Sequence, residues 1–169
     1  MQSGPVVSEM GSGDWEDVRA IYAEGIATGQ ATFEVAAPAW EVWDTSHLSF
    51  ARLVARHGEI VVGWAALSPV SRRQAYSGVA EVSVYVAPDQ RETGIGRQLL
   101  EALIAQSEMH GIWSLQAVMF PENAASVALH LRCGFREVGR RERIGKLDGA
   151  WRDTLLLERR NQRIGLDGI

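Results

Sequence analysis

The chain has 169 residues, of which 46% are hydrophobic and 22% are charged, which suits one domain with a substantial core. Its formal net charge of -4 argues against a nucleic-acid partner, because proteins that bind nucleic acids usually present a dominant basic field. No apolar run is long enough to span a membrane, and the N-terminus lacks the basic and apolar segments of a secretory signal. Cys133 is the only cysteine, so no internal disulfide can form and we expect a cytoplasmic protein.

The order of the predicted elements indicates an α+β (α/β) domain with a mixed, mostly antiparallel sheet and one central crossover. We expect a single domain over residues 1–169, with its core at about 6–157 and a polar, frayed tail at 158–169. The predicted elements, in chain order, are a strand at 6–10, a helix that Asp14 caps, a short helix at 40–47, strands at 48–56, 60–67 and 79–87, a helix from Ile95 to Gly111, a strand at 113–119, a helix at 123–132, and a hairpin of strands at 135–144 and 150–157.

The strand at 79–87 leads through a loop into a long helix that begins with two glycines, Gly94 and Gly96. The first backbone N–H groups of a helix have no partner within it, and the helix dipole favours an anion there. Glycine lets a ligand approach the backbone closely, and Arg91 and Arg97 add donors for a phosphate. The stretch predicts a phosphate-binding loop, although an ordinary strand-to-helix turn would also account for it.

Two common phosphate-binding folds do not fit this loop. A P-loop needs lysine and then serine or threonine after its last glycine, whereas Arg97 and Gln98 follow Gly96. A dinucleotide fold needs a third glycine where Leu99 stands, and an acid at the end of the next strand, which residues 114–118 lack.

Two blocks of sequence resemble the GCN5-related N-acetyltransferases. The first follows a Val-Tyr-Val strand, is similar to the acetyl-CoA signature of that superfamily, and reads Arg91-x-x-Gly94-x-Gly96. The second is similar to the superfamily's later helix and following strand, and reads Asn123-x-x-Ser126-x-x-Leu129-His130-x-x-x-Gly134-Phe135. The two blocks occur in the family's order and at a suitable separation.

Further stretches resemble the phosphinothricin and methionine sulfoximine acetyltransferase branch, over nearly the whole chain from Val6 to Leu157. They are Thr32-Phe33-Glu34, Gly63-Trp64, Ala75-Tyr76, the strand from Glu81 to Val86, and Trp151. The resemblance implies a sheet flanked by helices, and direct transfer of acetyl from acetyl-CoA to the amino group of a small amino-acid-like substrate. It also implies a homodimer, in which the terminal hairpin with Trp151 helps to build the substrate pocket.

The resemblance places the pantetheine arm of acetyl-CoA along the backbone of the central strand, like an added strand, and its phosphates at the helix start. Asn123 is a predicted helix cap as well as a partner for the pantetheine arm. The residues that we expect to contact acetyl-CoA are Val84, Tyr85, Val86, Arg91, Glu92, Thr93, Gly94, Ile95, Gly96, Arg97, Asn123 and Ser126.

Glu81 is the predicted general base, acting through a water molecule. It shares a strand face with Ser83 and Tyr85, whereas the valines between them face the other way. A carboxylate in such a valine-rich strand is unfavourable unless it faces a cleft, and acetyl transfer needs a group that accepts the proton of the amine. The alternative is an exposed strand carboxylate without a role.

His130 stands where many members of the superfamily have a tyrosine that protonates the departing thiolate, and the resembled branch has a histidine there. It is either the general acid or a contact to CoA, and a helical histidine of this kind also often serves packing alone. Tyr85 is a second candidate proton donor.

The acceptor substrate is expected to contact Phe33, Arg72 and Arg73. Either arginine could hold a carboxylate in a bidentate pair, and because some relatives have the arginine nearer position 71, which is Ser71 here, the choice stays open. Phe33, together with Trp64, is a candidate wall for an apolar side chain, unless these aromatic rings belong to the core.

Two other functions remain open. One is acetylation of a different amine, such as a protein N-terminus, a polyamine or an aminoglycoside, and the other is a CoA-binding sensor without catalysis. Glu81 argues against the sensor, since binding alone needs no carboxylate there. The scattered histidines and the single cysteine predict no metal site, and Cys133 has no nucleophile pattern around it.

Overall fold

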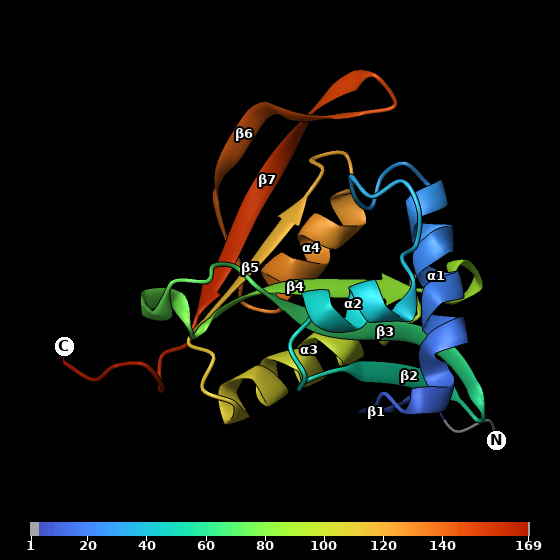
Figure 1. The fold of residues 1–169 in the computed structure, drawn as a ribbon, viewed down its shortest axis with the longest axis horizontal. Helices are drawn as coiled ribbons and strands as arrows, with labels where there is room; N and C mark the ends of the chain where they lie inside the picture. Colours follow the sequence, from blue (N-terminus) through green and yellow to red (C-terminus); the bar gives the residue numbers. More distant parts are fainter. Residues whose placement is uncertain (1–3, 169) are drawn as a thin grey trace.

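The computed structural model describes residues 4–168, so the predictions that concern residues 1–3 of the N-terminus and residue 169 lie outside the described residues. A seven-stranded sheet runs through the molecule in the order β1-β2-β3-β4-β5-β7-β6 (Figure 1). The strands are β1 (Val6–Glu9), β2 (Leu53–His57), β3 (Ile60–Pro69), β4 (Val79–Val86), β5 (Ser114–Met119), β6 (Arg136–Leu147) and β7 (Ala150–Arg160). The helices are α1 (Trp15–Ala27), α2 (Trp40–Ser46), α3 (Ile95–Met109) and α4 (Ala124–Arg132), with 3-10 turns η1 (Ser12–Asp14), η2 (Gln74–Tyr76) and η3 (Pro88–Gln90).

The sheet is antiparallel except between β4 and β5, which are parallel and joined through α3. A parallel pair needs a crossover of this kind, whereas antiparallel neighbours need only short turns. The predicted mostly antiparallel sheet with one central crossover is therefore confirmed. No helix among the described residues is long and apolar enough to cross a membrane.

Helices cover both faces of the sheet, and the side chains of β4 alternate between two cores. Val82 belongs to the core beneath α3, with Leu99 and Leu103 of that helix. Tyr85 packs into an aromatic core on the other face, with Val18 of α1 and Trp43 of α2. The hairpin of β6 and β7 extends beyond the helices (Figure 1).

Strand β2 begins at Leu53, five residues later than the sequence predicts. The segment before it folds around the Arg52 side chain, which donates hydrogen bonds to the carbonyl oxygens of Leu48 and His47. Ala51 adopts a φ of 56°, which an extended strand does not allow. The hydrogen bonds of the Arg52 side chain to the backbone just before it therefore override the apolar pattern of residues 48–52.

The C-terminal part is ordered further than predicted. Strand β7 continues to Arg160, which pairs with Ser114, and Asn161 is buried. The Arg160 guanidinium donates to the carbonyl oxygens of Trp113, Asn161, Ile164 and Gly165. These bonds fix residues 160–165 against the start of β5, so this part of the predicted frayed tail is ordered.

Asp14 precedes α1 as predicted, but its side chain does not cap that helix. The carboxylate accepts a hydrogen bond from the Gly11 backbone N–H at 2.7 Å and pairs with Arg56 of β2 at 2.6 Å. It therefore fixes the preceding turn, η1, to the sheet. The pairing with a residue 42 positions away is not visible in the local sequence.

Candidate active site

The parallel strands β4 and β5 separate soon after they begin. Residues 79–81 pair with residues 114–116, and no further pair joins the two strands within the described chain. Figure 1 shows them diverging toward α4. On its other edge, β4 stays paired with β3 as far as Val86. The backbone of residues 82–86 therefore has an edge toward β5 that is available to a ligand, where the sequence predicts the pantetheine arm.

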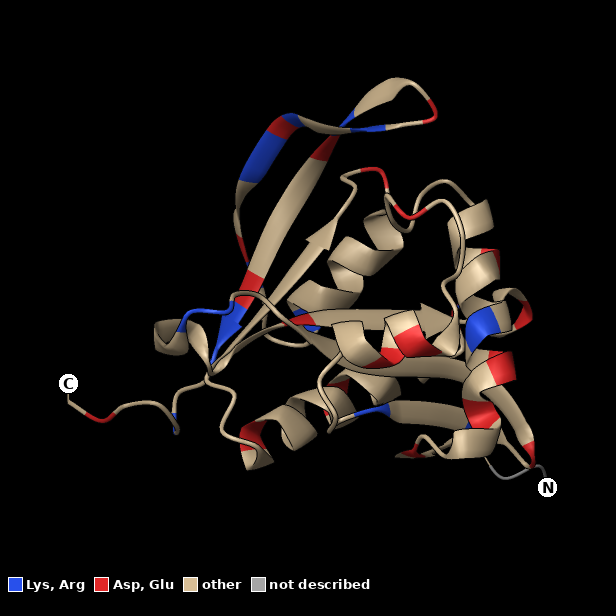
Figure 2. Ribbon diagram, viewed as in Figure 1, with Lys and Arg blue, Asp and Glu red and all other residues tan. Residues whose placement is uncertain are grey.

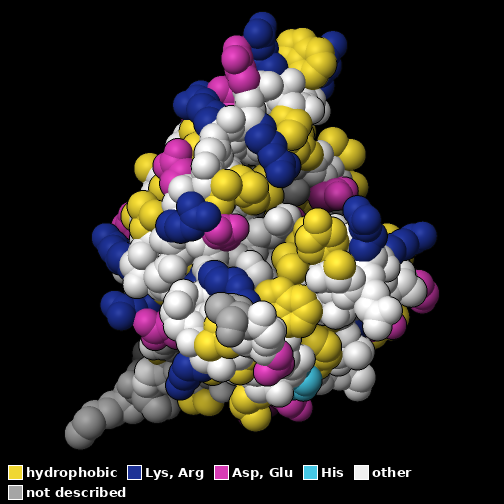
Figure 3. Space-filling view, turned by 90° about the vertical axis from the view of Figure 1, so that its left-hand side faces the viewer, with side chains coloured by type: hydrophobic (Ala, Val, Ile, Leu, Met, Phe, Trp, Pro, Cys, Tyr) yellow, Lys and Arg dark blue, Asp and Glu magenta, His cyan; other side chains and the backbone are white. Residues whose placement is uncertain are grey.

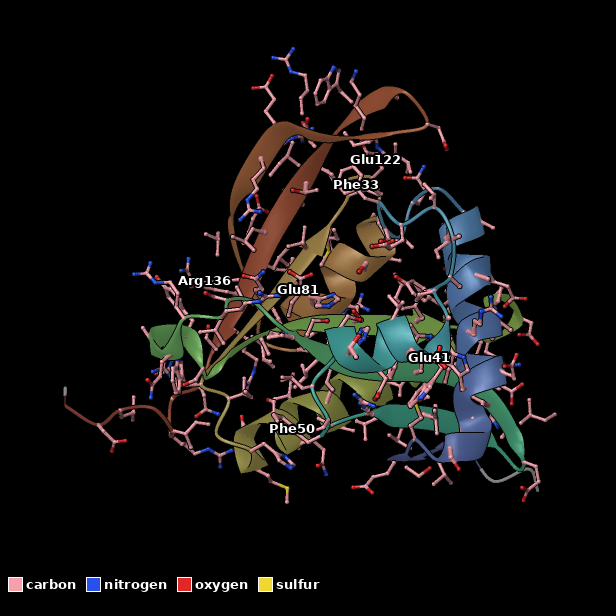
Figure 4. All side chains as sticks on the ribbon, in the orientation of Figure 1. Phe33, Glu41, Phe50, Glu81, Glu122 and Arg136 are labelled. Carbon is pink, nitrogen blue, oxygen red and sulfur yellow. The ribbon has the colours of Figure 1, made fainter. Side chains whose placement is uncertain are left out.

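Glu81 lies at the point of this fork. Its register partner is Gln116, the last residue of β5 that pairs with β4, and the Gln116 side-chain amide donates a hydrogen bond to Glu81 Oε2 at 2.6 Å. The carboxylate is half-buried between the two strands (Figure 4). A carboxylate held in this way keeps one defined orientation while its other oxygen stays available to a proton or a water molecule.

The start of α3 is packed against the end of β4 and against α4. Gly94 precedes the helix with a φ of 90°, a left-handed conformation that favours glycine, and no side chain caps the first turn. A Cβ on Gly96 would lie 3.3 Å from Leu129 of α4 and 3.6 Å from Val86. Three segments that the sequence assigned to the cofactor therefore meet at Gly96.

The arginines of this loop are exposed, and they differ in their partners. The Arg97 Nε donates to Glu101 Oε1 at 2.7 Å, one helical turn further along α3. Arg91 forms no ion pair within residues 4–168. The loop between them is shaped by Glu92, with a φ of 64°, and by the Thr93 hydroxyl, which donates to the Gln90 carbonyl. Arg91 is thus the arginine with the freer guanidinium.

Helix α4 begins as predicted, because the Asn123 side chain accepts a hydrogen bond from the Ser126 N–H at 3.2 Å. Near the other end of α4, His130 is buried against Phe135, and its Nδ1 lies 2.7 Å from the Ser126 carbonyl oxygen. A carbonyl oxygen only accepts, so Nδ1 carries the proton and Nε2 is the acceptor in the neutral ring. Burial lowers the pKa of His130, which favours that neutral form at neutral pH.

Two tyrosines lie together on the α1 side of β4. The rings of Tyr22 and Tyr85 are 4.8 Å apart, edge to face, and Trp64 stacks on Tyr85 at the same distance. Burial raises the pKa of Tyr22 to about 12, and the charge of Glu34 acts in the same direction. Burial also raises the pKa of Tyr85, so this hydroxyl is a weaker acid than an exposed tyrosine.

Phe33 lies in the loop between α1 and α2 and reaches the far end of the sheet. Its ring packs edge to face on Phe120, just beyond β5, with centroids 4.9 Å apart. It also covers Gly145 of β6, where a Cβ would come within 2.8 Å of the ring. A side chain at position 145 would therefore displace the Phe33 ring, and the contact brings the α1–α2 loop under the terminal hairpin.

Arg72 and Arg73 are exposed in the loop between β3 and β4, just before η2, and Figure 2 shows a basic segment there. Since Ser68 of β3 pairs with Glu81, this loop leaves the sheet at the same end of β4 as Glu81. Trp64, by contrast, is only 1% exposed and belongs to the aromatic core, so it does not line a pocket for the acceptor.

The geometry joins a candidate base, a free strand edge and an uncapped helix start, which together suit a thioester that carries phosphates. Sequence reasoning gave Gln116 no role, because its pairing with Glu81 depends on the register of two strands far apart in the chain. Its position between the buried Leu115 and Ala117 was the only signal. Within residues 4–168, no three His, Cys, Asp or Glu side chains gather as metal ligands.

Comparison with known proteins identifies the family. The acetyltransferase (GNAT) family model matches residues 15–135, which contain both cofactor blocks. The chain belongs to the GNAT family. This GNAT protein is 36% identical over 156 residues to a phosphinothricin N-acetyltransferase from Alcaligenes faecalis, a match that covers 86% of this chain and 77% of that protein. It is 37% identical over 98 residues to an L-methionine sulfoximine/L-methionine sulfone acetyltransferase from Pseudomonas aeruginosa, covering 58% of this chain and 57% of that protein.

Solved structures agree with the fold. A GNAT superfamily phosphinothricin acetyltransferase from Sinorhizobium meliloti, in complex with acetyl-CoA, has a TM-score of 0.84 at 26% identity and covers all of this chain and 98% of its own. A ribosomal-protein-alanine N-acetyltransferase from Brucella melitensis has a TM-score of 0.85 at 30% identity, with 92% and 99% covered. The predicted family and fold are confirmed, and this GNAT protein is an N-acetyltransferase with acetyl-CoA as the acetyl donor.

Proposed function

We propose that this GNAT protein acetylates the amino group of a small amino-acid-like substrate, of the phosphinothricin, methionine sulfoximine or methionine sulfone type. The observation that carries the proposal is the place of Glu81, which lies at the fork of β4 and β5 with its carboxylate fixed by Gln116. The names of the two curated relatives support this class of acceptor.

In the proposed reaction, the amine attacks the thioester carbonyl carbon directly, a C–N bond forms and the C–S bond breaks. Glu81 removes the proton from the incoming ammonium group through a water molecule, since an α-ammonium group is protonated at neutral pH. As the tetrahedral intermediate collapses, the CoA thiolate leaves with the electron pair of the C–S bond, and the nitrogen loses a second proton, which balances the proton that the thiolate takes up. The cofactor is held by the backbone edge of residues 82–86 and by the N–H groups at the start of α3.

His130 is assigned to cofactor contact rather than to proton donation. With Nδ1–H bonded to the Ser126 carbonyl and the pKa lowered by burial, the ring carries no proton on Nε2 at neutral pH. A general acid would need a proton on Nε2, whereas an unprotonated Nε2 can accept a hydrogen bond from CoA. Tyr85, whose pKa burial raises, is a weak donor for the same step.

The acceptor is placed on the Glu81 side of the sheet. Arg72 or Arg73 would hold its carboxylate, because both are exposed in the loop next to Glu81 and neither forms an ion pair within the described chain. Phe33, supported by Phe120, would lie against the apolar part of the acceptor side chain.

Replacement of Glu81 by glutamine tests the proposal, because it keeps the volume and removes the basicity. We expect normal acetyl-CoA binding, with kcat/KM for methionine sulfone lower by about a hundredfold or more near neutral pH. Raising the pH should restore part of the rate, since more amine then arrives deprotonated. Glu59→Gln, at the exposed turn between β2 and β3, is the matched control. Near-normal activity of Glu81→Gln at every pH would show that the base lies elsewhere.

A second candidate is acetylation of a protein N-terminus, which the similarity to the ribosomal-protein-alanine N-acetyltransferase from Brucella melitensis favours. Thiol release from acetyl-CoA should be measured with phosphinothricin, methionine sulfoximine, methionine sulfone, a polyamine, an aminoglycoside and an alanine-initiated peptide. Turnover of the peptide alone would replace the proposed acceptor class. CoA binding with no turnover of any amine would indicate a sensor.

We also propose a cytoplasmic homodimer in which the β6–β7 hairpin forms part of the contact. Val138, Ile144 and Trp151 of this hairpin are 44%, 49% and 57% exposed. Figure 3 shows hydrophobic side chains interspersed with basic ones from the hairpin down to the body of the protein. A fully active monomer by light scattering at micromolar concentration would contradict the dimer.

A further inference from the structure

Arg152 of β7 connects three segments that are far apart in the sequence. Its Nη1 donates to the Gly29 carbonyl oxygen at 3.0 Å, and its Nη2 donates to Gln30 Oε1 at 3.0 Å. Nη2 also lies 3.5 Å from a carboxylate oxygen of Glu122, in the loop between β5 and α4. The Arg152 side chain is 16% exposed, and its bond to Gly29 is partly buried, whereas its contacts with Gln30 and Glu122 lie at the surface. One guanidinium thus holds the α1–α2 loop against the β5–α4 loop.

The same guanidinium lies over the Phe120 ring, 3.9 Å from its centroid. Phe120 is 2% exposed, and its ring packs edge to face with that of Phe33. Figure 4 shows Phe33 and Glu122 beneath the β6–β7 hairpin. Arginine suits this position because its planar fork bonds two acceptors in its plane while its face stacks on an aromatic ring. The position of Phe33 therefore depends on Arg152 through Phe120 and through the loop that Arg152 holds.

A second contact joins the same two loops. Asn123 Nδ2 lies 3.4 Å from the Gln30 carbonyl oxygen, while its Oδ1 accepts the Ser126 N–H that starts α4. Gln30 is thus held by Arg152 through its side chain and by Asn123 through its backbone. These bonds connect the start of α4 to the loop that contains Phe33.

We propose that Arg152 is a positioning residue. It fixes the position of the α1–α2 loop, which carries Phe33, relative to the start of α4, which carries Asn123. The inference rests on the proposed function, in which Phe33 faces the acceptor and Asn123 faces the pantetheine arm. Arg152 does not touch either substrate in this scheme. It keeps the α1–α2 loop in the conformation that places the acceptor, and acetyl-CoA binding at the start of α4 stabilises that conformation further.

Two variants test the role, with one control. Arg152→Met keeps the length and removes both the charge and the fork, whereas Arg152→Lys keeps the charge and loses the fork. Arg140→Met removes an exposed arginine that pairs with Asp153 on the same hairpin. We expect Arg152→Met to raise KM for the amine by about tenfold or more, with a smaller change in kcat, because substrate placement is lost before the chemistry. Arg152→Lys should give an intermediate value, and Arg140→Met should match the wild type.

Hydrogen exchange of residues 29–34, with and without CoA, supplies a readout that needs no turnover. CoA should slow exchange in this loop of the wild type and of Arg140→Met, and should lose that effect in Arg152→Met. If the wild type acetylates none of the amines, the proposed acceptor is wrong, yet this comparison still decides the role of Arg152. CoA protection and KM values within about twofold of wild type in both Arg152 variants would overturn the inference. If Arg152→Met does not fold, Arg152→Lys decides by the same two measurements.

Discussion

Helices α3 and α4 both begin at the proposed cofactor site, and their first turns are built differently. At α4, the Asn123 side chain accepts a hydrogen bond from the backbone N–H of Ser126, which lies in the first turn of the helix. At α3, the residue in the same position is Gly94, which has no side chain to offer, and no acidic residue lies in the first turn. A Cβ at Gly94 would meet nothing within 4 Å, so the space above the helix start is open.

The start of α4 is stabilised by a side chain of the protein, whereas we propose that the start of α3 binds a ligand. The N–H groups at a helix start need an acceptor, which is either the protein itself or an anion from outside. Asn123 supplies that acceptor for α4 and stabilises the helix without any ligand. The start of α3 has no side-chain cap, and we propose that its N–H groups bind the phosphates of acetyl-CoA. Its stability without ligand therefore depends more on the buried contacts of Ile95 and Leu99.

The largest expected effect is at Gly94. Gly94→Asp places a carboxylate where we propose that the cofactor phosphates bind, and CoA affinity should fall by about a hundredfold or more, measured by calorimetry. Gly111→Asp is the matched control, because Gly111 ends the same helix with a φ of 76° and also has open space for a Cβ. Its backbone strain is similar, so it should lose stability but retain CoA binding. Equal affinities in the two variants would mean that the start of α3 does not hold the phosphates.

A smaller effect is expected at Asn123, where two substitutions distinguish the capping oxygen Oδ1 from the donor Nδ2 that faces Gln30. Asn123→Ala should lower the free energy of unfolding by about 1 kcal/mol, because the Ser126 N–H loses its acceptor. Asn123→Asp keeps that acceptor and removes only the donor that faces Gln30, so its stability should stay near that of the wild type. Urea unfolding measures both. Equal stabilities of the wild type and Asn123→Ala would contradict the capping role.

The smallest effect concerns His130, near the end of α4. Burial lowers its pKa in the folded protein, so as the pH falls below the ordinary value of 6.5 the unfolded chain takes up a proton first. The stability that His130 contributes is therefore complete above that pH and is lost as the pH falls through the folded pKa. His130→Gln should show a shallower loss of stability between about pH 7 and pH 5 in urea unfolding. His47, whose pKa burial also lowers, keeps some of the slope in both proteins. An unchanged slope would mean that His130 does not titrate differently on folding.

Local patterns were sufficient for the elements that carry the cofactor prediction. The valine-rich alternation of residues 79–86 predicted a strand with Glu81 and Tyr85 on one face, and the two cores of the structure confirm it. The Asn123 cap was also predicted correctly, because its partner is three residues away. The segment at 48–52 was predicted wrongly as strand, since its conformation depends on Arg52 and its acceptors in the preceding turn.

The sequence by itself determined the family, the succession of strands and helices along the chain, and the place of the two glycines at the start of α3. Each of these depends on motifs whose residues lie close together in the chain. Only the tertiary structure decided that Gln116 holds Glu81, that Trp64 belongs to the core, and that Arg152 joins the loops of Phe33 and Asn123. Those pairs are set by strand register and by packing between segments more than 30 residues apart, such as Gln116 and Glu81 at a separation of 35. Spacing along a chain does not encode which distant residues meet, since the free energy of packing the whole domain selects them.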